Sequence, residues 1–270
     1  MAIILAVANQ KGGVGKTTTS VNLATALFDE GQRVLLVDMD PQGNATTGVG
    51  VDKDGLELSC CDLLLSQPPL ADVIVHTEAG IDIVPANGDL TAAEVGLMED
   101  PLREKRLDAV LQEVRARYDY ILIDCPPSLN MLTLNAMVAA DRVLVPLQTE
   151  YYALEGLSSL LQTIDQIKIS RNSQLEVDGL LRTMHDTRNR LGGDVSAQLL
   201  EHFGDKVYRT VIPRNVRLAE APSHGMPVMR YDRSSRGAAA YSVLAGEILR
   251  RHEKESLRGQ GSDFSTATKN

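Results

Sequence analysis

The sequence has few cysteines and no long apolar run. Its three cysteines, two of them adjacent (Cys60 and Cys61), give no disulfide framework and indicate a reducing compartment. No uninterrupted apolar stretch approaches the ~18 residues that a membrane-spanning helix needs. The start of the chain lacks the basic region of a secretory signal peptide, because Met1 leads directly into a short apolar segment. We therefore expect a cytoplasmic protein without a membrane span.

Cations are also in the minority. Lys and Arg total 27 against 36 Asp and Glu, so the formal net charge is −9. This balance argues against a protein that coats nucleic acid with its whole surface, although it leaves room for a local basic patch. The chain of 270 residues, with 43% apolar residues, is long enough to bury a sizeable core. We expect one domain over residues 1–257 and a disordered tail over residues 258–270, which are rich in Gly, Ser and Thr.

Two kinds of segment alternate along the chain. Short β-rich apolar runs are separated by longer stretches with helical periodicity; Val21, Ala24 and Leu27, for example, fall on one face of a helix expected over residues 16–29. This alternation predicts an α/β fold, with a mostly parallel twisted sheet and helices on both faces. The expected strands are residues 3–8, 34–38, 81–84, 120–124, 143–146 and 177–181, and further helices are expected up to about residue 118 and over residues 235–255.

A glycine-rich loop follows the first expected strand and opens the first expected helix. The glycines allow consecutive backbone N–H groups to point into one concavity, and the helix N-terminus adds partial positive charge. Lys16 is placed to reach the terminal phosphates of a nucleotide, and the Thr17 hydroxyl to ligate Mg²⁺. A plain glycine-rich turn is the alternative, but the strand–loop–helix context favours phosphate binding. The loop reads Lys11-Gly12-Gly13-Val14-Gly15-Lys16-Thr17-Thr18.

The loop departs from the general G-x-x-x-x-G-K-[ST] pattern. Gln10 stands at the first glycine position, and a second lysine, Lys11, opens the loop. With this second lysine the loop resembles the deviant phosphate loop of the MinD/ParA group of ATPases. The resemblance extends from the start of the chain to about residue 251. Within the group, the sequence is most similar to the chromosomal ParA (Soj) partition ATPases. The resemblance implies a weak Mg²⁺-dependent ATPase that binds ATP and ADP and forms a homodimer around ATP. On the residues alone, Lys11 is also compatible with a solvated surface lysine.

The resemblance gives Lys11 a specific role. In the family, this lysine reaches across the dimer interface to the phosphates of the partner's nucleotide. A second cation at these phosphates would stabilise the charge that develops in phosphoryl transfer. The implied catalytic residues are therefore Lys11, Lys16 and Asp40.

Carboxylates follow two of the expected strands. Asp38 and Asp40 come at the end of the second strand, and Asp124 ends the strand over residues 120–124. Carboxylates beside a phosphate loop can hold Mg²⁺ through water or position an attacking water. A turn-forming role for the Asp-x-Asp pair and a helix N-cap role for Asp124 are the alternatives. The resemblance assigns Asp40 to water activation and the metal, Asp38 to supporting hydrogen bonds, and Asp124 to Mg²⁺ through water.

Two other sequence features bear on small ligands. Cys125 follows Asp124, but a role as an iron–sulfur ligand is weak because no second cysteine stands at a suitable position. Pro213 and Asn215 lie in a segment that the spacing alone predicts to be a loop followed by a helix. The resemblance places them at the adenine pocket, where an Asn amide can pair with the adenine edge.

Basic residues concentrate near the C-terminal third of the chain. Residues 206–236 carry a net charge of +5, which leaves −14 for the rest. Such a distribution fits a local footprint on a phosphate backbone, with a solvated, salt-bridged face as the alternative. Aromatic residues make up only 4% and no helix–turn–helix signal is present, so we expect binding to double-stranded DNA without sequence preference. The candidate DNA-binding residues are Arg188, Arg190, Arg214 and Arg217.

The resemblance also implies partners. It predicts a protein associated with the nucleoid, whose hydrolysis is stimulated by a centromere-binding protein of the ParB type. The first strand begins at residue 3, so no N-terminal operator-binding domain is expected. A membrane-cycling ATPase of the MinD type is one alternative, although the end of the last expected helix has little apolar surface. A small-molecule ligase of the dethiobiotin synthetase type is the other.

Overall fold

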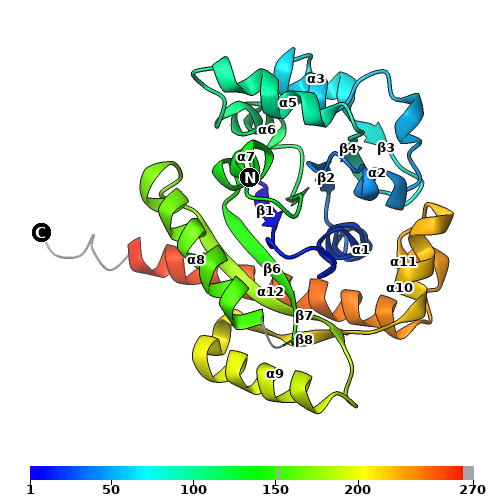
Figure 1. Cartoon of the computed structure of the whole chain (residues 1–270), viewed down its shortest axis with the longest axis vertical. Coiled ribbons are helices and arrows are strands. Elements are labelled where there is room, and N and C mark those ends of the chain that lie inside the picture. Colours follow the sequence, from blue (N-terminus) through cyan, green and yellow to red (C-terminus); the bar gives the residue numbers. More distant parts are fainter. Residues whose placement is uncertain (151–152, 264–270) are drawn as a thin grey trace, which may run out of the picture.

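An eight-stranded sheet runs through the centre of the molecule (Figure 1). The computed structural model describes residues 1–150 and 153–263, with side chains as far as residue 257. The strand order is β3-β4-β2-β5-β1-β6-β7-β8, and every neighbouring pair is parallel except β3 with β4. The strands are β1 (Ile3–Val7), β2 (Val34–Asp38), β3 (Val75–His76), β4 (Asp82–Val84), β5 (Tyr120–Asp124), β6 (Arg142–Gln148), β7 (Glu176–His185) and β8 (Val207–Pro213).

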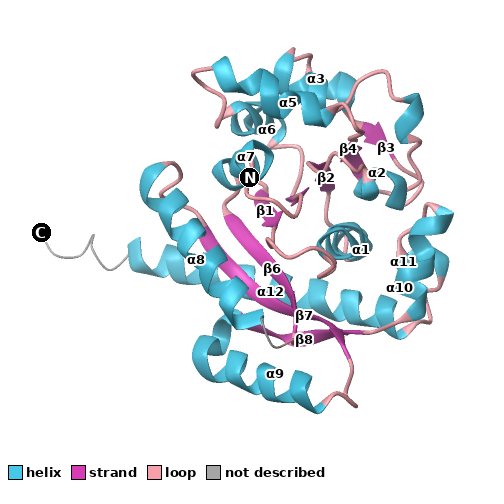
Figure 2. Cartoon of the chain, viewed as in Figure 1, coloured by secondary structure: helices cyan, strands magenta, loops and turns pink. Residues whose placement is uncertain are grey.

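Helices cover both faces of this sheet (Figure 2). One face carries α1, α2, α10, α11 and α12, and the other carries the helices from α3 to α9. The helices are α1 (Lys16–Asp29), α2 (Asn44–Gly48), α3 (Cys60–Leu65), α4 (Leu70–Val73), α5 (Leu90–Gly96), α6 (Arg106–Val114), α7 (Met131–Ala139), α8 (Ala153–Ser170), α9 (Arg190–Phe203), α10 (Val216–Glu220), α11 (Val228–Tyr231) and α12 (Arg236–Asp263). Among the described residues, none of these helices is long and apolar enough to cross a membrane.

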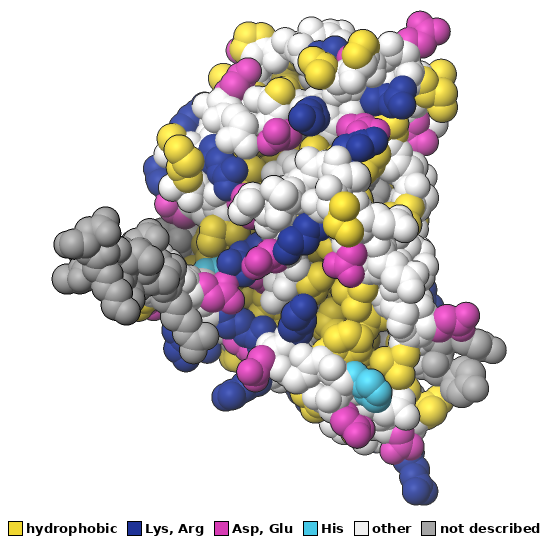
Figure 3. All heavy atoms as spheres, turned by 90° about the vertical axis from the view of Figure 1, so that its left-hand side faces the viewer, with side chains coloured by type: hydrophobic (Ala, Val, Ile, Leu, Met, Phe, Trp, Pro, Cys, Tyr) yellow, Lys and Arg dark blue, Asp and Glu magenta, His cyan; other side chains and the backbone are white. Residues whose placement is uncertain are grey.

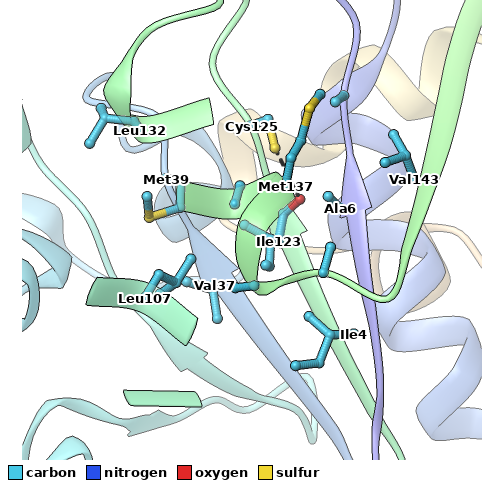
Figure 4. Close-up of a cluster of buried hydrophobic side chains, with 14 of the residues drawn as sticks. Ile4, Ala6, Val37, Met39, Leu107, Ile123, Cys125, Leu132, Met137 and Val143 are labelled. Carbon is cyan, nitrogen blue, oxygen red and sulfur yellow. Dashed lines mark hydrogen bonds between the residues drawn. The ribbon is translucent and has the colours of Figure 1, made fainter. Parts of the chain in front are cut away.

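Each buried strand contributes to two cores. In β1, Ile4 and Ala6 point to the face covered by α6 and α7, whereas Leu5 and Val7 pack under α1 and α12. Figure 4 shows part of the first of these cores, where Ala6 is drawn beside Ile123 and Met137. Because successive residues of a strand point to opposite faces, a strand buried on both faces must be apolar throughout. This explains the continuous apolar runs and confirms the α/β prediction.

The ends of two expected helices differ from the structure. The helix expected to end near Tyr118 ends at Val114, because Tyr118 is buried just before β5, with its hydroxyl donating to Asp82. The last helix, α12, continues to Asp263, past the expected start of the tail at residue 258. The remainder of that expected tail, residues 264–270, lies outside the described residues.

The strand β8 was not predicted from the sequence. Its residues run Val-Tyr-Arg-Thr-Val-Ile-Pro, with Val207 and Tyr208 both buried and Arg209 exposed. The adjacent buried residues Val207 and Tyr208, the polar pair after them and the final proline interrupt the alternation of apolar and polar residues that marks a strand. The prediction of a loop around residues 210–213 was therefore wrong, whereas the helix expected after it is α10.

Candidate nucleotide-binding site

The carboxyl ends of three neighbouring strands meet at one edge of the sheet. Val7 of β1 and Asp38 of β2 both pair in register with Asp124 of β5. The loop that follows Val7 leads directly into α1, so the N-terminus of this helix lies at the same edge. The fold therefore brings the glycine-rich loop and the carboxylates together, as the sequence predicts.

The phosphate loop is fixed to the sheet at Val14 and has open space beside Gly12 and Gly13. Gly13 and Gly15 have φ angles of +73° and +88°, which favour glycine. The buried Val14 offers its carbonyl oxygen to the Thr183 hydroxyl at 2.7 Å, which fastens the loop to β7. A Cβ added at Gly12 or Gly13 would meet no atom within 4 Å. The loop thus has fixed backbone angles and free space beside it for a ligand.

Lys16 is buried at the base of this loop. The residue is 7% exposed, and its Nζ donates to the carbonyl oxygen of Lys11 at 3.1 Å. Burial lowers the pKa of the Lys16 ammonium, while the charges of Asp124 and Asp40 oppose that shift. A bound phosphate would both supply a stronger partner and stabilise the charged form.

Asp124 has an oxygen without a partner. Its Oδ1 accepts from the Ser20 hydroxyl at 2.8 Å, but its Oδ2 is buried and accepts no hydrogen bond from any described residue. Burial and the nearby charge of Asp38 raise the pKa of this carboxyl to about 8. Asn130, not Asp124, caps α7, so the N-cap alternative is wrong.

The residues around Asp124 fit a Mg²⁺ site. The hydroxyls of Ser20 and Thr17 lie beside the Asp124 carboxyl and partly offset the rise of its pKa. Mg²⁺ binds oxygen ligands, keeps several waters and is shared with substrate phosphates. Thr17 and the Oδ2 of Asp124 are oxygen donors of this kind. When bound, Mg²⁺ would neutralise negative charge on the terminal phosphates.

Asp38 and Asp40 shape the turn after β2. Asp38 is fully buried and accepts from the N–H of Asp40, from the N–H of Thr46 and from the Thr46 hydroxyl, at 3.1, 2.9 and 2.7 Å. Burial raises the pKa of the Asp38 carboxyl to about 6 despite these bonds. Asp40 accepts from the N–H of Gln42 at 3.0 Å. Both residues therefore stabilise the turn, and Asp40 also lies close enough to act on the charge of Lys16.

Lys11 lies at the rim of the site. Its Nζ contacts the Oε2 of Glu150 at 2.6 Å, and the two side chains are 45% and 55% exposed. The Lys11 ammonium is therefore paired within its own chain rather than freely solvated.

Pro213 and Asn215 lie where β8 ends and α10 begins. Pro213 pairs with His185 at the end of β7, the same strand that anchors the phosphate loop through Thr183. Asn215 caps α10, with its Oδ1 accepting from the N–H of Arg217 at 2.9 Å. A contact with adenine remains a prediction for both residues.

The four candidate arginines lie in two neighbouring segments, Arg188 and Arg214 in loops, Arg190 at the start of α9 and Arg217 in α10. Arg188 and Arg190 follow β7, Arg214 and Arg217 follow β8, and these strands are adjacent. Arg188 is paired with Asp186, whereas Arg217 is paired with both Glu220 and Asp232. Within the described part of the chain, Arg190 and Arg214 form no ion pair. The alternative of a salt-bridged face therefore holds for Arg188 and Arg217.

Several site residues were missed in the sequence. Ser20 and Thr46 carry no motif of their own, although Ser20 follows Lys16 by one helical turn and so faces the same way. Glu150 and Thr183 lie far along the chain and reach the loop only because β6 and β7 extend beyond β1 at the carboxyl edge. Their only sequence signal is their place at the ends of apolar strands.

Comparisons with known proteins agree with this geometry. A protein-family profile described as an AAA domain matches residues 2–177. The chain is 51% identical to the chromosome partitioning protein ParA of Caulobacter vibrioides, over 94% of this chain and 97% of the relative. It is 52% identical to the sporulation initiation inhibitor protein Soj of Bacillus subtilis, over 92% and 98%.

A solved structure also covers nearly the whole chain. It is described as a cobyrinic acid a,c-diamide synthase from Mycobacterium smegmatis with bound ADP and magnesium. The TM-score is 0.83 at 39% identity, covering 94% of this chain and 96% of the other.

Proposed function

Because the chain belongs to the ParA/Soj family of phosphate-loop ATPases, we propose that it is an ATP-driven DNA-partitioning protein. Membership makes it an ATPase that uses ATP with Mg²⁺ and releases ADP. The proposal adds what the ATPase does: it binds double-stranded DNA without sequence preference as an ATP-bound dimer. A centromere-binding partner of the ParB type would stimulate hydrolysis, release the dimer and so move the attached DNA. We place the protein in the cytoplasm, on the nucleoid.

The observation that carries this proposal is the position of Lys11. This lysine belongs to the phosphate loop yet is half exposed at the rim, whereas Lys16 is buried at the base of the loop. In a dimer that joins two such rims, each Lys11 can contact the phosphates of the other subunit. Catalysis and dimerisation would then depend on the same contact.

The other site residues take roles within one subunit. Lys16 holds the terminal phosphates, and Thr17 with Asp124 holds Mg²⁺. Asp40, at the turn beside Lys16, orients the attacking water, while Asp38 keeps that turn in place. Pro213 and Asn215 bound the adenine.

DNA binding rests on the segments that follow β7 and β8. Among the described residues, Arg190 and Arg214 are the cations of this group without an ion pair, and a single subunit offers too few of them for strong binding. Two subunits joined at the same sheet edge would double the number of phosphate contacts. Each contact adds about 0.9 to the slope of log affinity against log salt concentration.

The double variant Arg190→Ala/Arg214→Ala tests the proposed DNA binding. With ATP and Mg²⁺ at low salt, its affinity for a labelled duplex of random sequence should fall more than tenfold in fluorescence anisotropy. The salt slope should fall by about 3 to 4, since up to four phosphate contacts per dimer are lost. Lys105→Ala/Arg117→Ala, which removes two exposed cations elsewhere, is the control. Wild type that never retains DNA, or an unchanged Arg190/Arg214 variant, would refute the DNA-binding part.

A small-molecule ligase is the second candidate. It is favoured by the similarity to the structure named as a synthase, at 39% identity. The relatives that are named for partition and sporulation control are more similar, at 51% and 52%, so partition is the better supported function. ADP release that depends on an added carboxylic acid and an amine donor would support the ligase instead.

A further inference from the structure

The ion pair between Lys11 and Glu150 joins two distant parts of the chain. The residues are 139 positions apart, yet the Lys11 Nζ and the Glu150 Oε2 approach to 2.6 Å. Lys11 belongs to the phosphate loop, and Glu150 lies in the turn between β6 and α8. The contact therefore joins the start of the phosphate loop to the carboxyl end of β6.

The backbone holds both ends of this pair in place. Asn9 donates from its Nδ2 to the Pro146 carbonyl of β6 at 2.7 Å, and its Oδ1 accepts from the N–H of Lys11 at 2.9 Å. Glu150 donates its N–H to the Gln148 carbonyl, and its own carbonyl accepts from the N–H of Ala153, both at 2.9 Å. The start of the phosphate loop is thus docked on β6, with Glu150 fixed beside it.

We propose that Glu150 is a positioning residue that holds Lys11 on its own subunit until the phosphates of an ATP-bound partner displace it. The inference rests on the proposed role of Lys11 across the dimer. A lysine ammonium is a compact point charge. To reach the partner's phosphates, it must leave its 2.6 Å contact with the carboxylate.

Nucleotide binding is coupled to this release through Lys16. The Nζ of Lys16 donates to the carbonyl oxygen of Lys11, at 3.1 Å. When Lys16 turns to a phosphate, Lys11 loses this backbone contact and keeps those with Glu150 and Asn9. ATP binding therefore loosens the same residue that dimerisation must move.

The expected effect of the Lys11–Glu150 ion pair on the dimerisation constant is modest for each subunit and larger for the dimer. An exposed ion pair shifts an equilibrium by at most about fivefold. Each dimer must break two such pairs, so the dimerisation constant is lowered by up to about 25-fold. Glu150 would in this way raise the ATP concentration at which dimers form.

Glu150→Gln tests this directly. Sedimentation velocity in Mg²⁺ and a slowly hydrolysed ATP analogue should give a dimer dissociation constant about 2- to 25-fold lower than in wild type. The difference should vanish at about 1 M salt, where the Debye length is only about 3 Å. Glu155→Gln changes an exposed carboxylate in the first turn of α8 and should leave the constant unchanged. Glu150→Ala should match Glu150→Gln.

The possible outcomes distinguish a failure of the positioning role of Glu150 from a failure of the proposed role of Lys11. If Lys11→Ala blocks dimerisation while Glu150→Gln dimerises as wild type or more weakly, the positioning role is wrong and the proposed function stands. If Lys11→Ala dimerises as well as wild type, the role of Lys11 across the interface fails, and the positioning role fails with it.

Discussion

At the scale of single residues, the site is built from opposite charges that the fold buries together. Burial lowers the pKa of Lys16 and raises that of Asp124 to about 8, so each group resists its charged form. A triphosphate beside Lys16 and a cation beside Asp124 would reverse both effects. The Oδ2 of Asp124, which no described residue contacts by a hydrogen bond, marks where that cation would bind.

Replacing Asp124 with Asn should separate function from stability. We expect Mg²⁺-dependent ATP hydrolysis to fall by about 100-fold or more, because the amide is a poor Mg²⁺ ligand and carries no charge. The melting temperature of the nucleotide-free protein should stay equal or rise, since a buried carboxylate is costly. Phosphate release and thermal unfolding measure the two effects, with the exposed Asp194→Asn as control. An Asp124→Asn variant that hydrolyses ATP at the wild-type rate would contradict the assignment.

Residues within a motif could be predicted, whereas those brought in by topology could not. Lys16 and Asp124 follow from the order strand, loop, helix and from an apolar strand that ends in Asp. Glu150 contacts Lys11 only because β6 lies next to β1 and extends beyond it, and the order of strands is not readable from apolar patterns. The pairing of Arg217 with Asp232 likewise depends on how α10 and α11 fold back.

At the scale of elements, the edge strand β8 depends on α12. Glu247 of α12 accepts from the N–H groups of Arg209 and Thr210 and from the Thr210 hydroxyl, at 2.9, 2.9 and 2.7 Å, and it pairs with Arg251. Burial opposes ionisation of Glu247, but these hydrogen bonds and the Arg251 charge bring its pKa below the ordinary value. This clamp stabilises a strand that the local sequence alone did not predict.

Replacing Glu247 with Gln should destabilise the protein in a pH-dependent way. The loss should be about 1–2 kcal/mol at pH 7, because hydrogen bonds to a charged acceptor become hydrogen bonds to a neutral one. The folded-state pKa of Glu247 is depressed, so its contribution is present above the unfolded-state pKa and is lost as pH falls through the folded value. The difference between the two proteins should therefore shrink below about pH 4.

Urea unfolding at about pH 7 and at about pH 3.5 measures this difference. Glu253→Gln, an exposed residue on the same helix, serves as control and should leave the unfolding free energy within about 0.5 kcal/mol of wild type. An equal loss at both pH values would show that Glu247 acts through packing rather than charge.

At the scale of the whole molecule, charge is distributed unevenly. The net charge is −9, while residues 206–236 carry +5. On the face formed by α8 and the end of α12, Lys and Arg side chains alternate with Asp and Glu (Figure 3). The described side chains of that face therefore do not form a surface of one sign. Arg190, the first residue of α9, and Arg214, in the loop after β8, lie instead at the sheet edge that carries the nucleotide site, so a dimer formed there would bring two weak basic patches together.

The central claim is that ATP creates the DNA-binding form through Lys11. Duplex binding with and without ATP, compared between wild type and Lys11→Ala by fluorescence anisotropy at low salt, tests it most directly. We predict that wild type binds only with ATP and Mg²⁺, and that Lys11→Ala binds ATP yet fails to retain DNA under either condition. Equal DNA binding by Lys11→Ala and wild type, or wild-type binding that ATP does not change, would contradict the account.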